Sequence, residues 1–156
     1  MNYVEGMEPE VHCPEESATL VKQGFRALKM RIGRYSVARE AKLAAAVRAV
    51  VGPDVLLMAD GNGAHTIESA VRMENVLNDL GFEAFEEHLP QSPKYAAYEE
   101  LRNRLPLSLA AGEAVDSRAA ARELIERRAM DIIQPDISLC GGFGEALFIA
   151  EMARLS

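Results

Sequence analysis

The stretch Val55–Glu87 (VLLMADGNGAHTIESAVRMENVLNDLGFEAFEE) decides the fold, because it contains one complete strand–helix–strand unit. Val55–Ala59 is a continuous apolar run, typical of a strand that is buried on both faces. The acidic, glycine-rich turn Asp60–Gly63 follows it, and Thr66–Leu80 then has the pattern of a helix that stops before a glycine. A second apolar run, Phe82–Phe85, leads into a pair of glutamates.

The same unit recurs on both sides of this stretch. We expect further strands at Phe25–Ile32, Leu107–Ala111 and Asp131–Gln134. We expect further helices at Pro14–Gln23, at Val37–Val51, from a Ser92-Pro93 cap to Leu105, from a cap at Asp116 or Ser117 to Ala129, and from about Gly144 onward. Apolar strands that alternate with helices predict a parallel sheet covered by helices.

Two architectures share this pattern, the closed (β/α) barrel and the open doubly wound sheet. The open sheet needs a glycine fingerprint directly after a strand, and Cys140–Gly144 (CGGFG) matches it poorly. We therefore predict an α/β fold, an incomplete TIM-type (β/α) barrel with parallel strands and outer helices. A complete barrel has eight units, so we expect a piece of a longer chain, with an N-terminal loop segment at 1–13 and a partial barrel domain at 14–156.

Composition narrows the possible partners. The 156 residues carry 17 basic and 24 acidic side chains, a net charge of −7, and have no basic run of the kind that binds nucleic acid. No apolar run is long enough to span a membrane, and the N-terminus lacks the features of a signal peptide. Cys13 and Cys140 fit no metal spacing and are expected to be reduced thiols, so we place the protein in the cytoplasm.

Carboxylates stand at the ends of four successive expected strands. They are Asp60, Glu86, Glu113 and Asp136, spaced 26, 27 and 23 residues apart. In a (β/α) barrel the strand ends meet at one rim, where the chemistry takes place. Lys29 and Arg31 lie two residues apart on an earlier strand, so both side chains can point to the same face. The sequence therefore predicts a cluster of acidic and basic groups at this rim.

Three carboxylates that converge on one point repel each other and need a cation to stay ionised. Oxygen ligands without Cys or His suit Mg²⁺, Mn²⁺ or Ca²⁺ and do not suit Zn²⁺. We predict a Mg²⁺ site, with Mn²⁺ as the alternative metal, on Asp60, Glu86 and Glu113. The loop that starts at Asp60 does not match an EF-hand calcium loop. Ala64 and His65 occupy positions where an EF-hand loop has Asp or Asn and then Gly. The other interpretation is that these acids are helix caps or solvated loop residues.

Short motifs follow one another along the chain. They are Gly24–Gly33 (GFRALKMRIG), Met58–Asn62 (MADGN), Phe85–Glu87 (FEE), Ala111–Glu113 (AGE), Ile133–Asp136 (IQPD) and Cys140–Gly142 (CGG). With these motifs the chain resembles, from about Pro14 onward, the barrel domain of the enolase superfamily, in the mandelate racemase and muconate lactonizing enzyme branch. The resemblance covers strands 2 to 6 of that barrel. Each motif is weak alone, but the ordered set is specific.

The resemblance implies removal of the proton α to a substrate carboxylate, with Mg²⁺ stabilising the enediolate that forms. It implies the same three metal ligands and a substrate-contacting Lys29. Arg31 stands where the family has a basic Lys, and Asp136 where one subgroup pairs an Asp with a His on the next strand. Asn62 is a further candidate for substrate binding. The family's N-terminal capping domain and the last strands are expected to lie outside this chain.

Two positions depart from the family pattern. Arg31 is a poor general base, because a guanidinium stays protonated at physiological pH, so binding or charge stabilisation is its expected role. His88 replaces the usual Pro and is either a substrate contact or a neutral replacement in the loop.

We predict a Mg²⁺-dependent lyase or isomerase that acts on a small-molecule carboxylate, with dehydration of a sugar acid as the first choice. The alternatives are a racemase or epimerase, a cycloisomerase of the same superfamily, and a catalytically incompetent fragment of such an enzyme. We expect no nucleic-acid or membrane partner, and a homo-oligomer in the full-length form.

Overall fold

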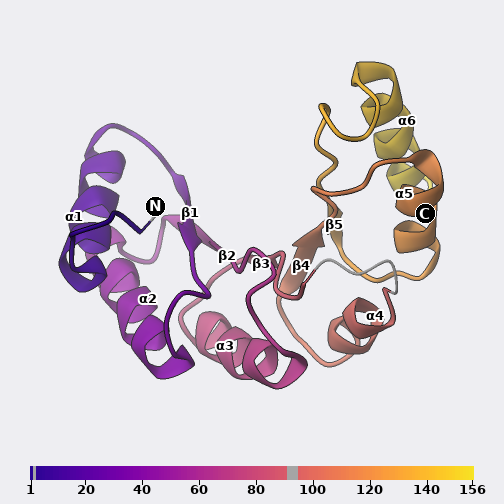
Figure 1. The fold of residues 1–156 in the computed structure, drawn as a ribbon. Helices are drawn as coiled ribbons and strands as arrows, with labels where there is room; N and C mark the ends of the chain where they lie inside the picture. The colour runs from indigo at the N-terminus through magenta and orange to yellow at the C-terminus, as the bar shows by residue number, and fades with distance from the viewer. Residues whose placement is uncertain (2, 91–94) are drawn as a thin grey trace.

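The strands form one parallel sheet in which each strand pairs with the next along the chain. The structure is a computed structural model that describes residues 1, 3–90 and 95–156. The strands are β1 (Ala27–Arg31), β2 (Leu56–Asp60), β3 (Ala84–Glu86), β4 (Ser108–Ala111) and β5 (Ile132–Ile133). They follow an arc that does not close (Figure 1). Sequential pairing along an arc confirms the incomplete barrel and argues against the doubly wound sheet.

The helices lie on the outer side of this arc (Figure 1). They are α1 (Pro9–Lys22), α2 (Val37–Val51), α3 (Ile67–Asp79), α4 (Ala96–Arg102), α5 (Arg118–Glu126) and α6 (Phe143–Arg154). Ser36, Thr66 and Ser117 cap α2, α3 and α5 by accepting a backbone N–H in the first turn. The bounds of α2 are those that the sequence predicts, and Ser117 is the cap of α5.

The N-terminus differs from the expectation. Helix α1 begins at Pro9, so the predicted loop segment at 1–13 already contains the first turn of a helix. Proline opens a helix well, which explains Pro9, whereas Pro14 lies inside the helix and removes one backbone donor there. Cys13 and Ser17 are buried on this helix.

Several other elements are shorter than predicted, among them α4, α5, β1 and β5. Helix α4 ends at Arg102 instead of Leu105, and its expected Ser92-Pro93 cap lies outside the described residues. Strand β5 has two residues instead of four. None of the helices in the described ranges is long and apolar enough to cross a lipid bilayer.

The core lies between the sheet and the helices, and the alternation along β1 shows how it forms. Leu28 and Met30 are buried toward the helices, whereas Lys29 and Arg31 point to the inner face of the arc. Successive strand residues face opposite sides, so one short strand supplies both the core and the charged groups. The same alternation on β2 buries Leu57 in the core.

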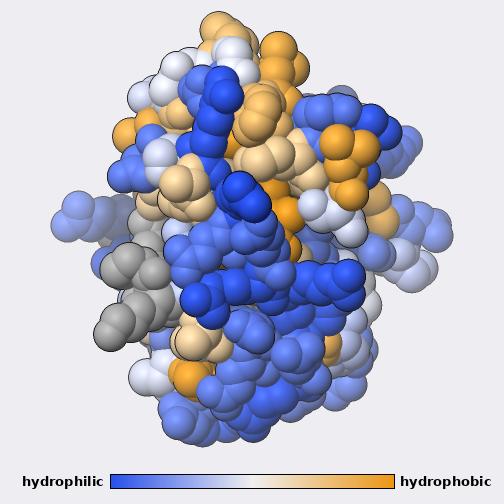
Figure 2. All heavy atoms as spheres, turned by 90° about the vertical axis from the view of Figure 1, so that its right-hand side faces the viewer, coloured by the Kyte–Doolittle hydropathy of each residue, from blue (hydrophilic) through white to orange (hydrophobic). Residues whose placement is uncertain are grey.

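The two edges of the sheet differ. Met1 covers part of the β1 edge, since its terminal amine donates to the Lys29 carbonyl at 2.7 Å and its carbonyl accepts the Arg31 N–H at 3.0 Å. Beyond β5, helix α6 exposes large apolar side chains, among them Phe143 and Leu147. Figure 2 faces this side and shows apolar atoms gathered in its upper part, over α6.

Candidate metal centre

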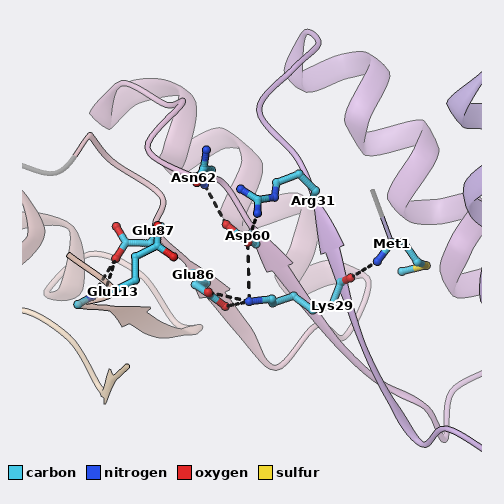
Figure 3. A network of polar contacts seen from close by, with 9 residues as sticks. Met1, Lys29, Arg31, Asp60, Asn62, Glu86, Glu87 and Glu113 are labelled. Carbon is cyan, nitrogen blue, oxygen red and sulfur yellow. Dashed lines mark hydrogen bonds and ion pairs between the residues drawn. The ribbon is translucent and has the colours of Figure 1, made fainter. Parts of the chain in front are cut away.

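The sheet register places three of the predicted residues in one row. Arg31 on β1 is the direct partner of Asp60 on β2, and Asp60 is the direct partner of Glu86 on β3. These strands are parallel, so their carboxyl ends meet at the same rim, as Figure 3 shows. The structure therefore brings these three predicted residues together at one rim.

Lys29 lies between the two strand-borne carboxylates. Its Nζ is 2.7 Å and 2.6 Å from the two carboxylate oxygens of Glu86, and 3.7 Å from Oδ2 of Asp60. Arg31 adds a second cation, with Nη2 3.3 Å from the same Asp60 oxygen. Asp60 and Glu86 are both buried, so these ion pairs compensate two desolvated negative charges. A cation therefore already bridges the two carboxylates in this structure.

The loop after β2 is held against its neighbours by backbone hydrogen bonds. The Gly61 N–H donates to the Glu86 carbonyl at 2.8 Å. Oδ1 of Asp60 accepts the Asn62 N–H at 3.0 Å, and Asn62 adopts a left-handed φ of 44°. The Asn62 side chain is exposed at the rim.

Glu113 reaches the same region from the loop after β4. Partial burial is the main cause that raises its pKa, and repulsion from Glu87, Asp60 and Glu86 raises it further, while Arg31 opposes the shift. This coupling shows that the carboxylate of Glu113 lies in the negative field of the other acids. The rim therefore carries more negative charge than Lys29 and Arg31 compensate.

The donor set fits a hard divalent cation. Within the described part of the chain, no three His, Cys, Asp or Glu side chains are close enough together to hold a metal ion in their present positions. The ammonium between Asp60 and Glu86 nevertheless shows that the site accommodates a cation. Asp60, Glu86 and Glu113 all supply carboxylate oxygens, the ligands that Mg²⁺ and Mn²⁺ prefer. These three residues would hold such an ion after Lys29 moves aside.

The two other predicted residues lie in different surroundings. Oδ1 of Asp136 accepts both the N–H and the hydroxyl of Ser138, at 2.7 Å and 2.5 Å, and these bonds lower the Asp136 pKa. His88 is fully buried between the rings of Phe85 and Tyr98, and burial lowers its pKa to about 4. A substrate contact from His88 would require the loop to open, so this position favours the replacement interpretation.

The sequence motifs do not identify Glu87 as a residue of this site. Glu87 is buried, and its carboxylate accepts the backbone N–H of Gly112 at 2.8 Å and that of Glu113 at 3.4 Å. Its only signal in the sequence is that it follows Glu86 in a glutamate pair. Spacing alone does not show which glutamate of the pair faces the rim and which faces the next loop.

Comparison with known proteins gives a consistent result. Residues 13–155 match the family described as enolase C-terminal domain-like. The chain is 36% identical over 141 residues to D-galactarolactone cycloisomerase of Agrobacterium fabrum, covering 90% of this chain and 36% of that protein. It is 34% identical over 141 residues to arabinonate dehydratase of Saccharolobus solfataricus, covering 90% of this chain and 38% of that protein.

A solved structure shares the fold. The chain superimposes with a TM-score of 0.89 and 25% identity on a mandelate racemase/muconate lactonizing enzyme from a marine actinobacterium in complex with magnesium. The match covers 99% of this chain and 42% of the other one. The chain thus spans about two fifths of the length of the relatives that it matches.

Proposed function

The chain belongs to the enolase C-terminal domain-like family, and on that premise we propose that it carries the metal-binding part of an enzyme that removes the proton α to a substrate carboxylate. Our first choice of reaction is dehydration of a sugar acid. The observation that supports the metal-binding role most is the row of Arg31, Asp60 and Glu86 across three strands, with Lys29 between the two carboxylates. A relative that is 34% identical is an arabinonate dehydratase.

We propose that Asp60, Glu86 and Glu113 hold Mg²⁺, with Mn²⁺ as the alternative metal. When bound, the ion supplies positive charge to the substrate carboxylate and acidifies the neighbouring C–H. The magnesium complex of a structural relative with 25% identity supports this choice of metal. A bound ion would draw these three carboxylates closer together than they are in this structure.

The cationic side chains of β1 have separate roles in this proposal. Lys29 would leave Glu86 and contact the substrate carboxylate as an ammonium, in which case a residue outside these 156 is the base. The alternative is that Lys29 loses its proton and is itself the base. Arg31 stays protonated and stabilises negative charge beside Asp60. Asn62 offers its exposed side chain to substrate hydroxyls. We retain Asp136 as a catalytic candidate that would act with a histidine outside these 156 residues.

Cycloisomerisation is the second candidate reaction. It is favoured by the 36% identity to a galactarolactone cycloisomerase, which resembles this chain as closely as the dehydratase does. Both relatives act on compounds derived from sugar acids, so the substrate class is the same in either case. The chain spans 36% to 38% of these relatives, so we assign the activity to a longer protein that contains it. A homo-oligomeric, cytoplasmic enzyme remains our prediction for that protein.

Calorimetric titration with Mg²⁺ tests the metal centre directly. Glu113→Gln removes one negative ligand without changing the shape of the side chain, and we expect it to abolish measurable Mg²⁺ binding. The control is Asp116→Asn, three residues further on and exposed, which should bind as the wild type does. Equal Mg²⁺ affinity of Glu113→Gln and the wild type would refute the ligand assignment.

A substrate screen separates the candidate reactions. The longer protein is incubated with a library of sugar acids and their lactones, and the products are analysed by mass. Dehydration lowers the product mass by one water, whereas cycloisomerisation and racemisation leave it unchanged. Mass loss with at least one acid sugar is the expected result.

A further inference from the structure

Glu87 follows Glu86 directly, yet its carboxylate serves another part of the molecule. Glu86 faces Lys29 at the rim, whereas Glu87 is 2% exposed and faces the loop after β4. The backbone of Glu87 has a φ of 41°, in the left-handed region that residues other than glycine rarely adopt. A conformation of this kind persists only where surrounding contacts enforce it.

The contacts of Glu87 reach the loops that follow β2 and β4. Its carbonyl accepts the Gly63 N–H at 2.6 Å, in the loop that begins at Asp60. Its Oε1 accepts the N–H groups of Gly112 and Glu113 at 2.8 Å and 3.4 Å. Glu87 itself is covalently joined to Glu86. Glu87 therefore contacts the backbone at Glu113 and at Gly63, three residues after Asp60, and Figure 3 shows its carboxylate beside Glu113.

Helix α4 holds the carboxylate from the other side. The Tyr98 hydroxyl lies 3.2 Å from Oε2 of Glu87 and 2.7 Å from the Leu89 carbonyl. The backbone N–H of Glu87 donates to the Ala110 carbonyl at 2.9 Å, at the end of β4. Oε1 thus accepts backbone N–H groups, and Oε2 lies beside a hydroxyl whose one proton it shares with the Leu89 carbonyl, so these contacts reduce the cost of removing the carboxylate from water.

Packing alone does not fix the turn at Gly112 and Glu113, whose N–H groups Glu87 accepts. A cavity of about 310 Å³ borders that turn and is lined by Gly112, Val115, Leu124 and Tyr98 together with Glu87. Because side chains leave this space open, the turn lacks close packing on one side, and hydrogen bonds to Oε1 restrain it. Losing them would free the Glu113 backbone to move toward the cavity.

From these contacts we infer that Glu87 is a positioning residue, which fixes the backbone of Gly112 and Glu113 and so sets the distance between the Glu86 and Glu113 carboxylates. The inference rests on the proposed metal centre. Glu87 itself does not touch the metal or the substrate. Outer-shell groups that orient metal ligands commonly change metal affinity by about 10- to 100-fold.

The test compares Glu87→Ala with Glu87→Gln in the 156-residue chain, using Mn²⁺ alone as the probe and electron paramagnetic resonance as the readout. Glu87→Ala should bind Mn²⁺ at least about tenfold more weakly than the wild type. Glu87→Gln keeps a carbonyl acceptor for the Gly112 N–H and should stay within about threefold. Asp116→Ala, which lines the same cavity with an exposed carboxylate, is the matched control and should not change the affinity.

A second readout works without metal. Amide hydrogen exchange of Gly112 and Glu113 should accelerate in Glu87→Ala and stay near the wild-type rate in Glu87→Gln. If the wild type binds no Mn²⁺, the proposed metal centre fails, and the exchange rates alone decide whether Glu87 positions this turn. If Glu87→Ala is folded and equals the wild type in Mn²⁺ affinity or in exchange, the inference is overturned.

A third variant covers the case in which Glu87→Ala does not fold. Tyr98→Phe removes the hydroxyl that contacts Oε2 and leaves the carboxylate in place. We expect Mn²⁺ binding about threefold weaker and faster exchange at Gly112. Wild-type values for both measurements in a folded Tyr98→Phe protein would overturn the inference.

Discussion

The first three strands and the last two strands present their charged groups in different ways. On β1 to β3, Lys29, Arg31, Asp60 and Glu86 stand on the strands themselves, and cations pair with the carboxylates. After β4, Glu113 stands on a loop whose backbone is bound by Glu87. Strand-borne groups are fixed by the sheet register, whereas a loop-borne group depends on a few local hydrogen bonds. Mutations should therefore affect the two halves differently.

The largest effect on stability is expected at the loop after β1. Oε1 of Glu40, a fully buried residue, accepts four hydrogen bonds, from the N–H groups of Gly33, Arg34 and Tyr35 and from the Tyr3 hydroxyl. Glu40→Ala leaves these donors unsatisfied, and we expect the free energy of unfolding to fall by about 3 kcal/mol in urea denaturation. Glu40→Gln retains one acceptor oxygen and should lose less than half of that.

Glu40→Ala also tests whether mutations in the two halves change metal affinity differently. Lys29 and Arg31 precede this loop and are held by the sheet, so folded Glu40→Ala should keep its Mn²⁺ affinity within about threefold. Glu87→Ala should lose affinity, because it loosens a loop that carries a ligand. Equal losses of affinity in the two variants would show that the halves are not built differently.

An intermediate effect is expected at Lys29. Its ammonium occupies the space between Asp60 and Glu86 and competes with any metal for their oxygens. Lys29→Met removes this competitor, and we expect Mg²⁺ to bind about tenfold more tightly, which is about 1.4 kcal/mol. Arg31→Met is the control, since Arg31 contacts only one of the two carboxylates and should have a smaller effect. Unchanged or weaker Mg²⁺ binding by Lys29→Met in calorimetry would contradict this account of the cation between them.

The smallest effect is expected where helix α3 contacts the entry to β4. Oε1 of Glu74 accepts the Leu107 N–H at 2.7 Å at the entry to β4, while its Oε2 has no hydrogen-bond partner among the described residues. Burial raises the pKa of Glu74, and the Leu107 N–H opposes the shift. A raised pKa in the folded state contributes stability below the unfolded pKa, and this stability is lost as pH rises through the folded pKa.

Glu74→Gln should remove this pH dependence. We expect the variant to be more stable than the wild type by about 1 kcal/mol at pH 8 and similar to it near pH 4, in urea denaturation at both pH values. Asp79→Asn on the exposed face of the same helix is the matched control and should show no difference. A higher free energy of unfolding for the wild type than for Glu74→Gln at pH 8 would mean that the charged form of Glu74 stabilises the contact with Leu107.

The sequence predicts the parts of this molecule that local chemistry determines. The bounds of α2 follow from a Ser cap at one end and a glycine at the other, and β2 follows from an uninterrupted apolar run. The row of Arg31, Asp60 and Glu86 follows from repeated units of similar length. These features depend on few residues that are close together in the chain.

The sequence does not predict features that depend on distant contacts. Helix α1 extends back to Pro9 because its buried face packs on α2, which outweighs the proline inside it. The direction of the Glu87 carboxylate is set by N–H groups 25 and 26 residues further along the chain. The burial of His88 likewise depends on Phe85 and on Tyr98 of α4. Such contacts form only after the sheet is assembled.

The alternation along β1 limits how the sequence can vary in length. Leu28 and Met30 face the core, while Lys29 and Arg31 face the inner side of the arc. Inserting or deleting a single residue within this strand would exchange the two sets and bury both cations among apolar side chains. A two-residue change would preserve the facing but shift the partner of Asp60. Relatives of this chain should therefore differ in length in the loops between the elements and keep β1 at constant length.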